Sequence, residues 1–174
     1  ESRGLGDVYK RQAFSWLILE YFSNKKLSLL GLLSGVLSGL VTITPAAGFV
    51  NYLSAYIISM IGGIACYFVV NSIKEKLRYN DTLDAFGIHG VGGVIGAILT
   101  GVFQSHKVNK DILDGLIYTG HLHTIWIQCI AVVVVVVYSI IITFIIGKTL
   151  SIFMSLATTV EEDMTGLDQL VHGE

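Results

Sequence analysis

One histidine stands alone in a long uncharged segment of the chain. His89 lies in the stretch Asp84-Ala-Phe-Gly-Ile-His-Gly-Val-Gly-Gly-Val-Ile-Gly-Ala-Ile-Leu-Thr-Gly-Val-Phe103, which contains no other titratable side chain after Asp84. An ionisable group is costly at membrane depth, so such a residue is by default a candidate functional site. Imidazole accepts a hydrogen bond on one ring nitrogen and donates one from the other, so it can hold a small polar molecule or relay a proton.

The glycines that follow His89 leave room beside its side chain. Gly93 comes four residues later and Gly96 seven, so a helix would place both on the histidine face, with Gly92 close by. Little side-chain bulk on that face would let another helix or a small molecule approach the imidazole. Two interpretations follow: His89 borders a site or passage, or it is a core histidine bonded to a neighbouring helix.

Two acidic residues, Asp81 and Asp84, stand just before this segment. Carboxylates in that position can cap free backbone N–H groups and interact favourably with the positive end of a helix. We therefore expect both to hold the start of the helix that carries His89.

Other metal-ligating residue types are sparse. His121 and His123 form a His-x-His pair, but no third ligand of a suitable type lies close in sequence, so we expect no metal site and no cofactor. Cys66 and Cys129 both fall in apolar segments, where cysteine is more often a small core residue than half of a disulfide. A membrane redox or metal protein that uses His89, His121 and His123 as ligands is an alternative, and bound metal or haem would identify it.

Composition predicts a membrane protein. Hydrophobic residues make up 53% of the 174 residues and charged residues 14%, whereas soluble domains carry about 25% charged residues. Four uncharged runs, each close to the length of a membrane-spanning helix, occupy residues 27–44, 51–70, 85–103 and 126–147. None has the polar face that a soluble helical bundle requires. We expect an all-α, polytopic transmembrane helix bundle, and a net charge of −2 without a basic stripe argues against nucleic-acid binding.

Positive charges predict the orientation in the membrane. Alternate loops hold six Lys and Arg residues against two, the six being Lys25, Lys26, Lys74, Lys76, Arg78 and Lys148 and the two being Lys107 and Lys110. The side that is richer in Lys and Arg should be cytoplasmic. This places the C-terminal end inside the cell, and His89 a little over one turn into its helix from the cytoplasmic loop.

The first full span carries a stripe of small residues, namely Gly31, Ser34, Gly35, Ser38 and Gly39. Such a stripe lets two membrane helices touch backbone to backbone. We interpret it as a packing seam, with a seam beside a conduit as the alternative. Pro45 should end this helix, with Thr44 biased toward an extended conformation before it.

Three separate segments together resemble the ammonium transporter family, which is related to the Rh proteins. Residues 39–50, Gly-Leu-Val-Thr-Ile-Thr-Pro-Ala-Ala-Gly-Phe-Val, resemble its Gly-Leu-Val and Thr-Pro-Ala-small-Gly-aromatic stretch. Residues 84–103 resemble its Asp-x-Phe-Gly-x-His-Gly element, and residues 161–174 resemble its cytoplasmic tail with Gly-Leu-Asp and His-Gly-Glu. The segments follow the family's order, so the resemblance covers about residues 13–174.

The resemblance implies a fold of eleven spans, made of two inverted five-helix repeats and a last long helix. This chain would correspond to the end of the seventh span through the eleventh, so we expect it to be a truncated C-terminal half. The expected parts are a non-native leader at residues 1–11, transmembrane helices at residues 12–156 and a cytoplasmic tail at residues 157–174.

The resemblance also implies roles for individual residues. His89 matches the second histidine of the family's twin-histidine pore. The residues expected to support the pore are Asp81, Asp84, Phe86, Gly87, Gly90, Gly93 and Ser34. Those expected in the regulatory tail are Gly166, Leu167, Asp168, His172, Gly173 and Glu174. The family's first pore histidine and its aromatic gate belong to earlier spans, which are absent from this sequence.

The function that the resemblance implies is transport of ammonium or ammonia across a membrane, without enzymatic chemistry. A bare ammonium ion pays on the order of 20 kcal/mol to enter a low dielectric in the idealised limit, and neutral ammonia avoids most of this cost. A narrow apolar pore with a neutral imidazole would thus pass ammonia and reject sodium and potassium.

The implied setting is the plasma or inner membrane of the cell, with ammonium and the lipid bilayer as partners. The resemblance also implies a homotrimer and a PII-family regulator at the tail. The alternative function is a non-conducting sensor or structural membrane piece whose tail binds a regulatory partner.

Overall fold

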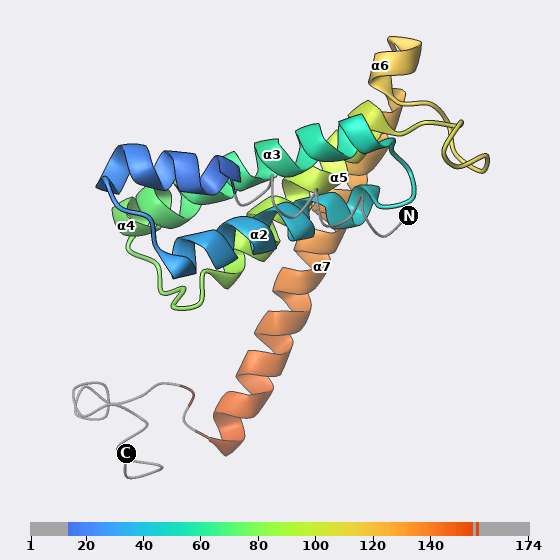
Figure 1. Cartoon of the computed structure of the whole chain (residues 1–174). Coiled ribbons are helices and arrows are strands. Elements are labelled where there is room, and N and C mark those ends of the chain that lie inside the picture. The colour runs from blue at the N-terminus through green and yellow to red at the C-terminus, as the bar shows by residue number, and fades with distance from the viewer. Residues whose placement is uncertain (1–13, 155, 157–174) are drawn as a thin grey trace. The chain divides into compact units, whose positions relative to one another are not determined.

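The computed structural model describes residues 14–154 and residue 156, and every regular element in that part of the chain is helical (Figure 1). A first helix covers residues 14–24. The elements after it are α2 (Leu29–Ile43), η1 (Thr44–Ala46), α3 (Tyr52–Phe68), η2 (Val69–Ile73), α4 (Lys74–Leu77), η3 (Phe86–Gly90), α5 (Val91–Phe103), α6 (Leu116–Thr119) and α7 (His123–Phe153). The element η1 is a 3-10 turn, and η2 and η3 are π-helical turns. The expected all-α fold is confirmed.

Four helical stretches are long and apolar enough to cross a membrane: Leu29–Ala46, Tyr52–Leu77, Phe86–Phe103 and His123–Phe153. They match the four predicted spans in number and order. The second and fourth are longer than predicted, because η2 and α4 continue α3 and because α7 has 31 residues. Both extensions include lysine, which ends an uncharged run in the sequence but does not interrupt the backbone hydrogen bonds of a helix.

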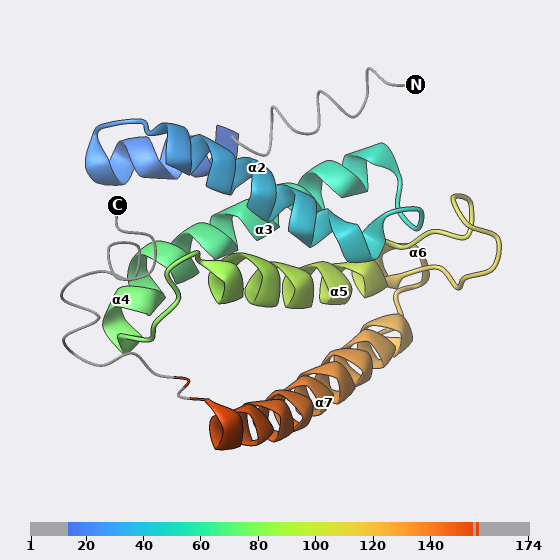
Figure 2. The ribbon, with the colours of Figure 1, turned by 90° about the horizontal axis from the view of Figure 1, so that it is seen from below.

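The first unit of the chain, up to Val132, is built around α2, α3 and α5, which lie side by side (Figures 1 and 2). Small residues line their contacts. Gly35 and Gly39 are buried on α2, Gly62 on α3, and Gly92 and Gly96 on α5, whereas the buried Gly31 faces Glu20 of the first helix. Close approach of backbones is a main source of association between membrane helices. The packing seam predicted on the first full span is therefore confirmed.

A buried carboxylate ties the helix at residues 14–24 to the start of α2. Glu20 is only 9% exposed, and the Ser28 hydroxyl donates a 2.6 Å hydrogen bond to Glu20 Oε1. The Ser28 hydroxyl oxygen also accepts a 2.8 Å bond from the Gly31 N–H, so it caps α2. A carboxylate beside the N-terminus of a helix is favoured by the free N–H groups there.

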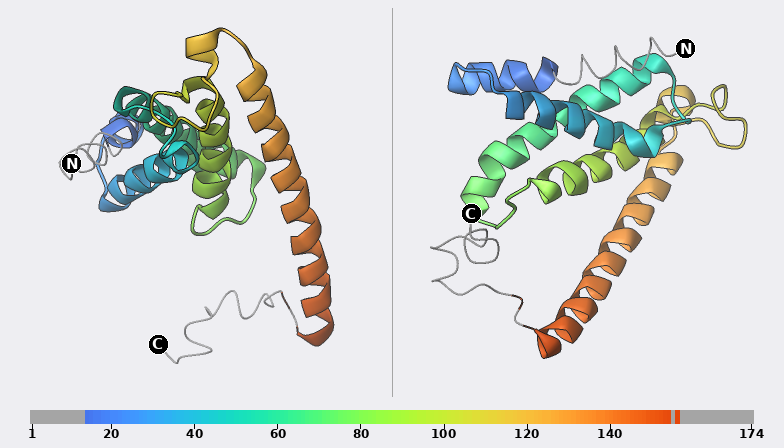
Figure 3. Two further views of the ribbon diagram at one scale, coloured as in Figure 1. Left: turned by 90° about the vertical axis from the view of Figure 1, so that its right-hand side faces the viewer. Right: turned by 60° about the horizontal axis from the view of Figure 1, so that its bottom comes forward.

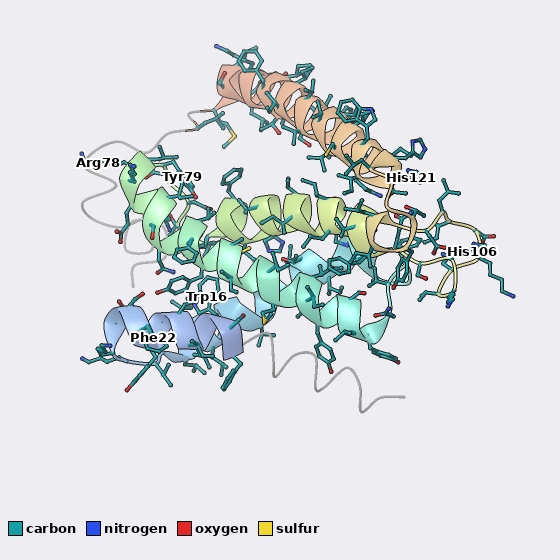
Figure 4. All side chains as sticks on the ribbon, turned by 90° about the horizontal axis from the view of Figure 1, so that it is seen from above. Trp16, Phe22, Arg78, Tyr79, His106 and His121 are labelled. Atoms are coloured by element: carbon teal, nitrogen blue, oxygen red, sulfur yellow. The ribbon has the colours of Figure 1, made fainter. Side chains whose placement is uncertain are left out.

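The same first helix packs on α3 through aromatic side chains. Trp16, labelled in Figure 4, meets Tyr67 edge to face. Their ring centroids are 5.3 Å apart. Cys66 is buried in this cluster, and Cys66 and Cys129 are both free thiols. Cys66 is therefore a small core residue, as the sequence predicted.

The end of α2 differs from the sequence expectation. Thr44 is right-handed helical, with φ −52° and ψ −47°, and Ala47 is the extended residue, with φ −61° and ψ 124°. The expectation of an extended Thr44 was wrong because its N–H still donates to the Leu40 and Val41 carbonyls and so continues α2 into η1, where Pro45 is tolerated in the first turn. The Thr44 hydroxyl donates a 2.7 Å bond to the Leu40 carbonyl and holds this turn.

Hydrogen bonds fix the segment between α5 and α7. The Ser105 N–H donates to the Phe49 carbonyl at 2.8 Å, and the Thr124 hydroxyl donates to the Gly101 carbonyl at 2.7 Å. The second unit begins at Val133 and contains the rest of α7, which is one uninterrupted helix from His123 to Phe153 (Figure 3).

Candidate functional site

His89 lies in η3, the π-helical turn that leads into α5. Its side chain is exposed in this chain, and among the described residues its ring makes no hydrogen bond. The interpretation of His89 as a core histidine bonded to a neighbouring helix therefore has no support within residues 14–154. Turns of π-helix inside α-helices are frequent at functional sites.

The glycines after His89 divide between two faces of α5. A methyl group on Gly92 would lie 3.1 Å from Thr42 Oγ1, and one on Gly96 would overlap the Thr42 carbonyl oxygen, so both glycines face α2 near its end. A methyl group on Gly93 would meet no atom within 4 Å. The sequence left open whether another helix or a small molecule approaches this small face, and at Gly96 it is a helix, α2. Gly93 lies on the open side.

Asp81 caps the helix that carries His89. Its Oδ2 accepts a 3.0 Å hydrogen bond from the Phe86 N–H and a 3.1 Å bond from the Gly87 N–H. These are two of the N–H groups that the first turn of a helix leaves without a partner. The predicted capping role is confirmed for Asp81.

Asp84 holds the same turn in another way. The sequence predicted that its side chain caps the helix, and this was wrong. Asp84 Oδ1 instead forms a 2.6 Å ion pair with Lys74 Nζ. The Asp84 carbonyl accepts a 2.8 Å bond from the Ile88 N–H, the residue before His89. Asp84 has φ 54°, in the left-handed region that non-glycine residues adopt only at some cost.

Phe86, Gly87 and Gly90 shape the turn around His89. The Phe86 ring is 60% exposed and meets Tyr79 edge to face, with centroids 5.8 Å apart. Gly87 is buried against η2, since a methyl group there would lie 2.7 Å from Val70 Cγ2. A methyl group on Gly90 would lie 2.9 Å from Phe86 Cδ2. The two π-helical turns, η2 and η3, therefore pack directly on each other at Gly87, which has no side chain.

Two other residues lie on the neighbouring helices. Cys66 Sγ lies 3.7 Å from the Ile88 carbonyl oxygen, a weak S–H···O contact from α3 to the histidine turn. Ser34 is half-buried on α2, and no hydrogen bond joins it to the described residues of the turn. The predicted tail residues, Gly166, Leu167, Asp168, His172, Gly173 and Glu174, lie outside the described residues.

Sequence reasoning missed Lys74 as part of this site and used it only to predict orientation. Lys74 Nζ also donates a 2.5 Å bond to the Asp81 carbonyl. The signal available in the sequence was a cation at the end of an apolar run, ten residues before an aspartate. Only the folded loop brings the two charges together.

The histidines of the other loop lie away from this site. Figure 4 shows Arg78 and Tyr79, just after α4, at one end of the α2–α3–α5 bundle, and His106 and His121 at the other end. His121 and His123 are both exposed. In the part of the chain that the structure describes, no group of three His, Cys, Asp or Glu side chains could hold a metal ion.

Comparison with known proteins identifies the family of the chain. The model of the Ammonium Transporter Family matches residues 11–174. An ammonium transporter of Bacillus subtilis (strain 168) is 47% identical over 159 residues, which cover 91% of this chain and 39% of that protein. This chain thus spans about two-fifths of the length of that relative.

Solved structures agree. The crystal structure of Saccharomyces cerevisiae Mep2 matches with a TM-score of 0.73 and 36% identity, over 79% of this chain and 32% of that one. A structure described as a sensor Amt protein matches with a TM-score of 0.80 and 28% identity, over 97% of this chain and 40% of that one. The chain has helices of membrane length, and its relatives are transporters, so it is an integral membrane protein of a transporter family and not an enzyme. The family model and the relatives together show that it belongs to the ammonium transporter family.

Proposed function

We propose that the protein moves ammonium across a membrane by conducting ammonia through a narrow apolar passage bordered by His89. The observation that carries this proposal is an exposed imidazole that makes no hydrogen bond to the described residues, in a span that contains no other titratable side chain. Gly93, four residues later, leaves the adjoining surface open.

The chemistry of the imidazole suits this substrate. The cost of bringing a bare ion into a low dielectric, on the order of 20 kcal/mol in the idealised limit, acts against sodium, potassium and ammonium alike. Only ammonium can give up a proton and continue as a neutral molecule. A neutral imidazole can accept a hydrogen bond from the amine on one nitrogen and donate from the other, so it can hold the substrate and pass on its proton.

The surrounding contacts support a fixed position for His89. Asp81 caps the turn from one side, and Gly87 sits directly against Val70 on the other. A site that acts on a small substrate gains from side chains held close to the productive geometry. Phe86, Gly90 and Ser34 are proposed to support the passage through packing.

The setting of the protein follows from charge and from its relatives. We propose a location in the plasma or inner membrane with the C-terminus in the cytoplasm, because alternate loops differ in their Lys and Arg content. Assembly as a homotrimer, a partner histidine from another repeat, and a PII-family regulator bound at residues 166–174 complete the proposal.

Uptake of methylammonium by cells that lack their own ammonium transporters tests the function. The complete protein should support uptake, and His89→Ala should abolish it or make it non-selective against potassium. His121→Ala is the matched control, since that histidine lies exposed in the loop at the other end of the bundle. Unchanged flux and selectivity in His89→Ala would count against a role in the passage.

A second candidate is a sensor that binds ammonium and signals through its tail. The similarity to a sensor Amt protein favours it. Methylammonium uptake, measured with and without residues 157–174, separates the two functions. A transporter should take up methylammonium even after these residues are removed. A sensor should show no uptake in either form.

A further inference from the structure

The Lys74 side chain links the end of the span Tyr52–Leu77 to the residues just before the span Phe86–Phe103 through hydrogen bonds. It lies at the first position of α4, where the long helix that begins at Tyr52 comes to its end. Its ammonium group contacts Asp84 Oδ1 at 2.6 Å and the Asp81 carbonyl oxygen at 2.5 Å. One side chain of the α3–η2–α4 helix therefore binds both aspartates that precede the histidine turn.

Both contacts lead to backbone groups of η3. Asp81, held through its carbonyl, uses its carboxylate to accept from the N–H groups of Phe86 and Gly87. Asp84, held through its carboxylate, uses its carbonyl to accept from the Ile88 N–H. The three N–H groups directly before His89 are thus bound to residues that Lys74 fixes.

The loop between α4 and η3 has two residues in unfavourable backbone conformations, so it needs contacts such as those of Lys74 to stay in place. Arg78 at its start has φ 51° and Asp84 at its end has φ 54°, both in the region that non-glycine residues adopt at a cost. The Lys74 and Asp84 side chains are 27% and 25% exposed, so water screens this pair less than a fully exposed pair.

We propose that Lys74 is a positioning residue for transport: its ammonium group sets the orientation of the π turn and hence of the His89 imidazole in the passage. This inference rests on the proposed function. Lys74 does not touch the substrate in this arrangement, so its loss should affect the rate of passage and leave recognition at the mouth of the passage intact.

The test uses the complete transporter, with methylammonium as the probe and the amount of protein in the membrane measured for each variant. Lys74→Met removes both donors and should lower the maximal uptake rate by about tenfold or more, because displacement of an acting group by about 1 Å can cost that much or more. The half-saturating concentration should stay the same. Lys74→Arg keeps a cation that can bind both oxygens, so it should restore most of the rate.

Lys76→Met is the matched control, because Lys76 is exposed on the same short helix. If Lys74→Met does not reach the membrane, Asp84→Gly tests the same pair from the other side and should also lower the maximal rate, because glycine lacks the acceptor and adopts the φ of 54° at no cost.

A normal maximal uptake rate in Lys74→Met overturns the proposal. The proposal is also overturned if Lys74→Arg lowers the maximal uptake rate as much as Lys74→Met does. A normal rate in Asp84→Gly, where Lys74→Met is missing from the membrane, overturns it too. If the unsubstituted protein takes up no methylammonium, the proposed function fails and this inference fails with it.

Discussion

Gly87 faces Val70 so closely that a methyl group on the glycine would lie 2.7 Å from Val70 Cγ2. These two residues belong to the π-helical turns η3 and η2, which come from different membrane spans. The contact shows why the turn that carries His89 can pack directly against the end of α3: the histidine turn presents no side chain there.

Gly87→Ala should destabilise the protein. The added methyl would press on a β-branched side chain that has little rotamer freedom, and overpacking of this kind costs about 1–3 kcal/mol. Thermal unfolding in detergent should show a lower midpoint. Gly93→Ala is the matched control, because a methyl there meets no atom within 4 Å, and equal midpoints for the two variants would contradict the packing described for η2 and η3.

Gly93→Val should separate transport from stability. A Cβ at position 93 meets no atom within 4 Å in this chain, so the unfolding midpoint should stay close to that of the unsubstituted protein. The bulk would narrow the proposed passage beside His89, and methylammonium uptake should fall. Full uptake in Gly93→Val would mean that the passage lies elsewhere.

Asp81→Ala should weaken the start of the histidine helix. Two backbone N–H groups would lose their acceptor, and loss of a capping side chain costs about 0.5–2 kcal/mol. Asp81→Asn retains a capping oxygen and should keep most of the stability. Asp111→Ala, at an exposed loop position, is the control for loss of a carboxylate. Equal unfolding midpoints for Asp81→Ala and Asp111→Ala would argue against the cap.

Thr124→Val should loosen the contact between the first turn of α7 and α5. The buried Thr124 hydroxyl donates to the Gly101 carbonyl at 2.7 Å, and hydrogen bonds between membrane helices are worth about 0.6 kcal/mol on average and up to about 1.7 kcal/mol. Thr149→Val removes a hydroxyl that donates within α7, to the Ile145 carbonyl at 2.8 Å. Thermal unfolding should therefore show a larger decrease for Thr124→Val, and the reverse order would contradict the role of this contact.

Several features of the protein could be predicted from the sequence because they depend on the chain locally. Runs of about 20 uncharged residues suffice to predict helices that cross a membrane, and the observed spans begin and end close to the predicted positions wherever no lysine intervenes. His89 was recognised because it is the sole titratable group in its span. The cap from Asp81 was expected because it acts on residues five and six positions later in the same stretch.

Other features depend on which segments meet, and only the tertiary structure decided them. The sequence left open what approaches the small face of α5, and the structure shows that Gly96 packs against the Thr42 carbonyl near the end of α2 whereas Gly93 stays open. The partner of Asp84 is Lys74, across a loop whose two left-handed residues bring the charges together. Helical periodicity describes one helix at a time, and the contacts that orient His89 come from neighbouring spans.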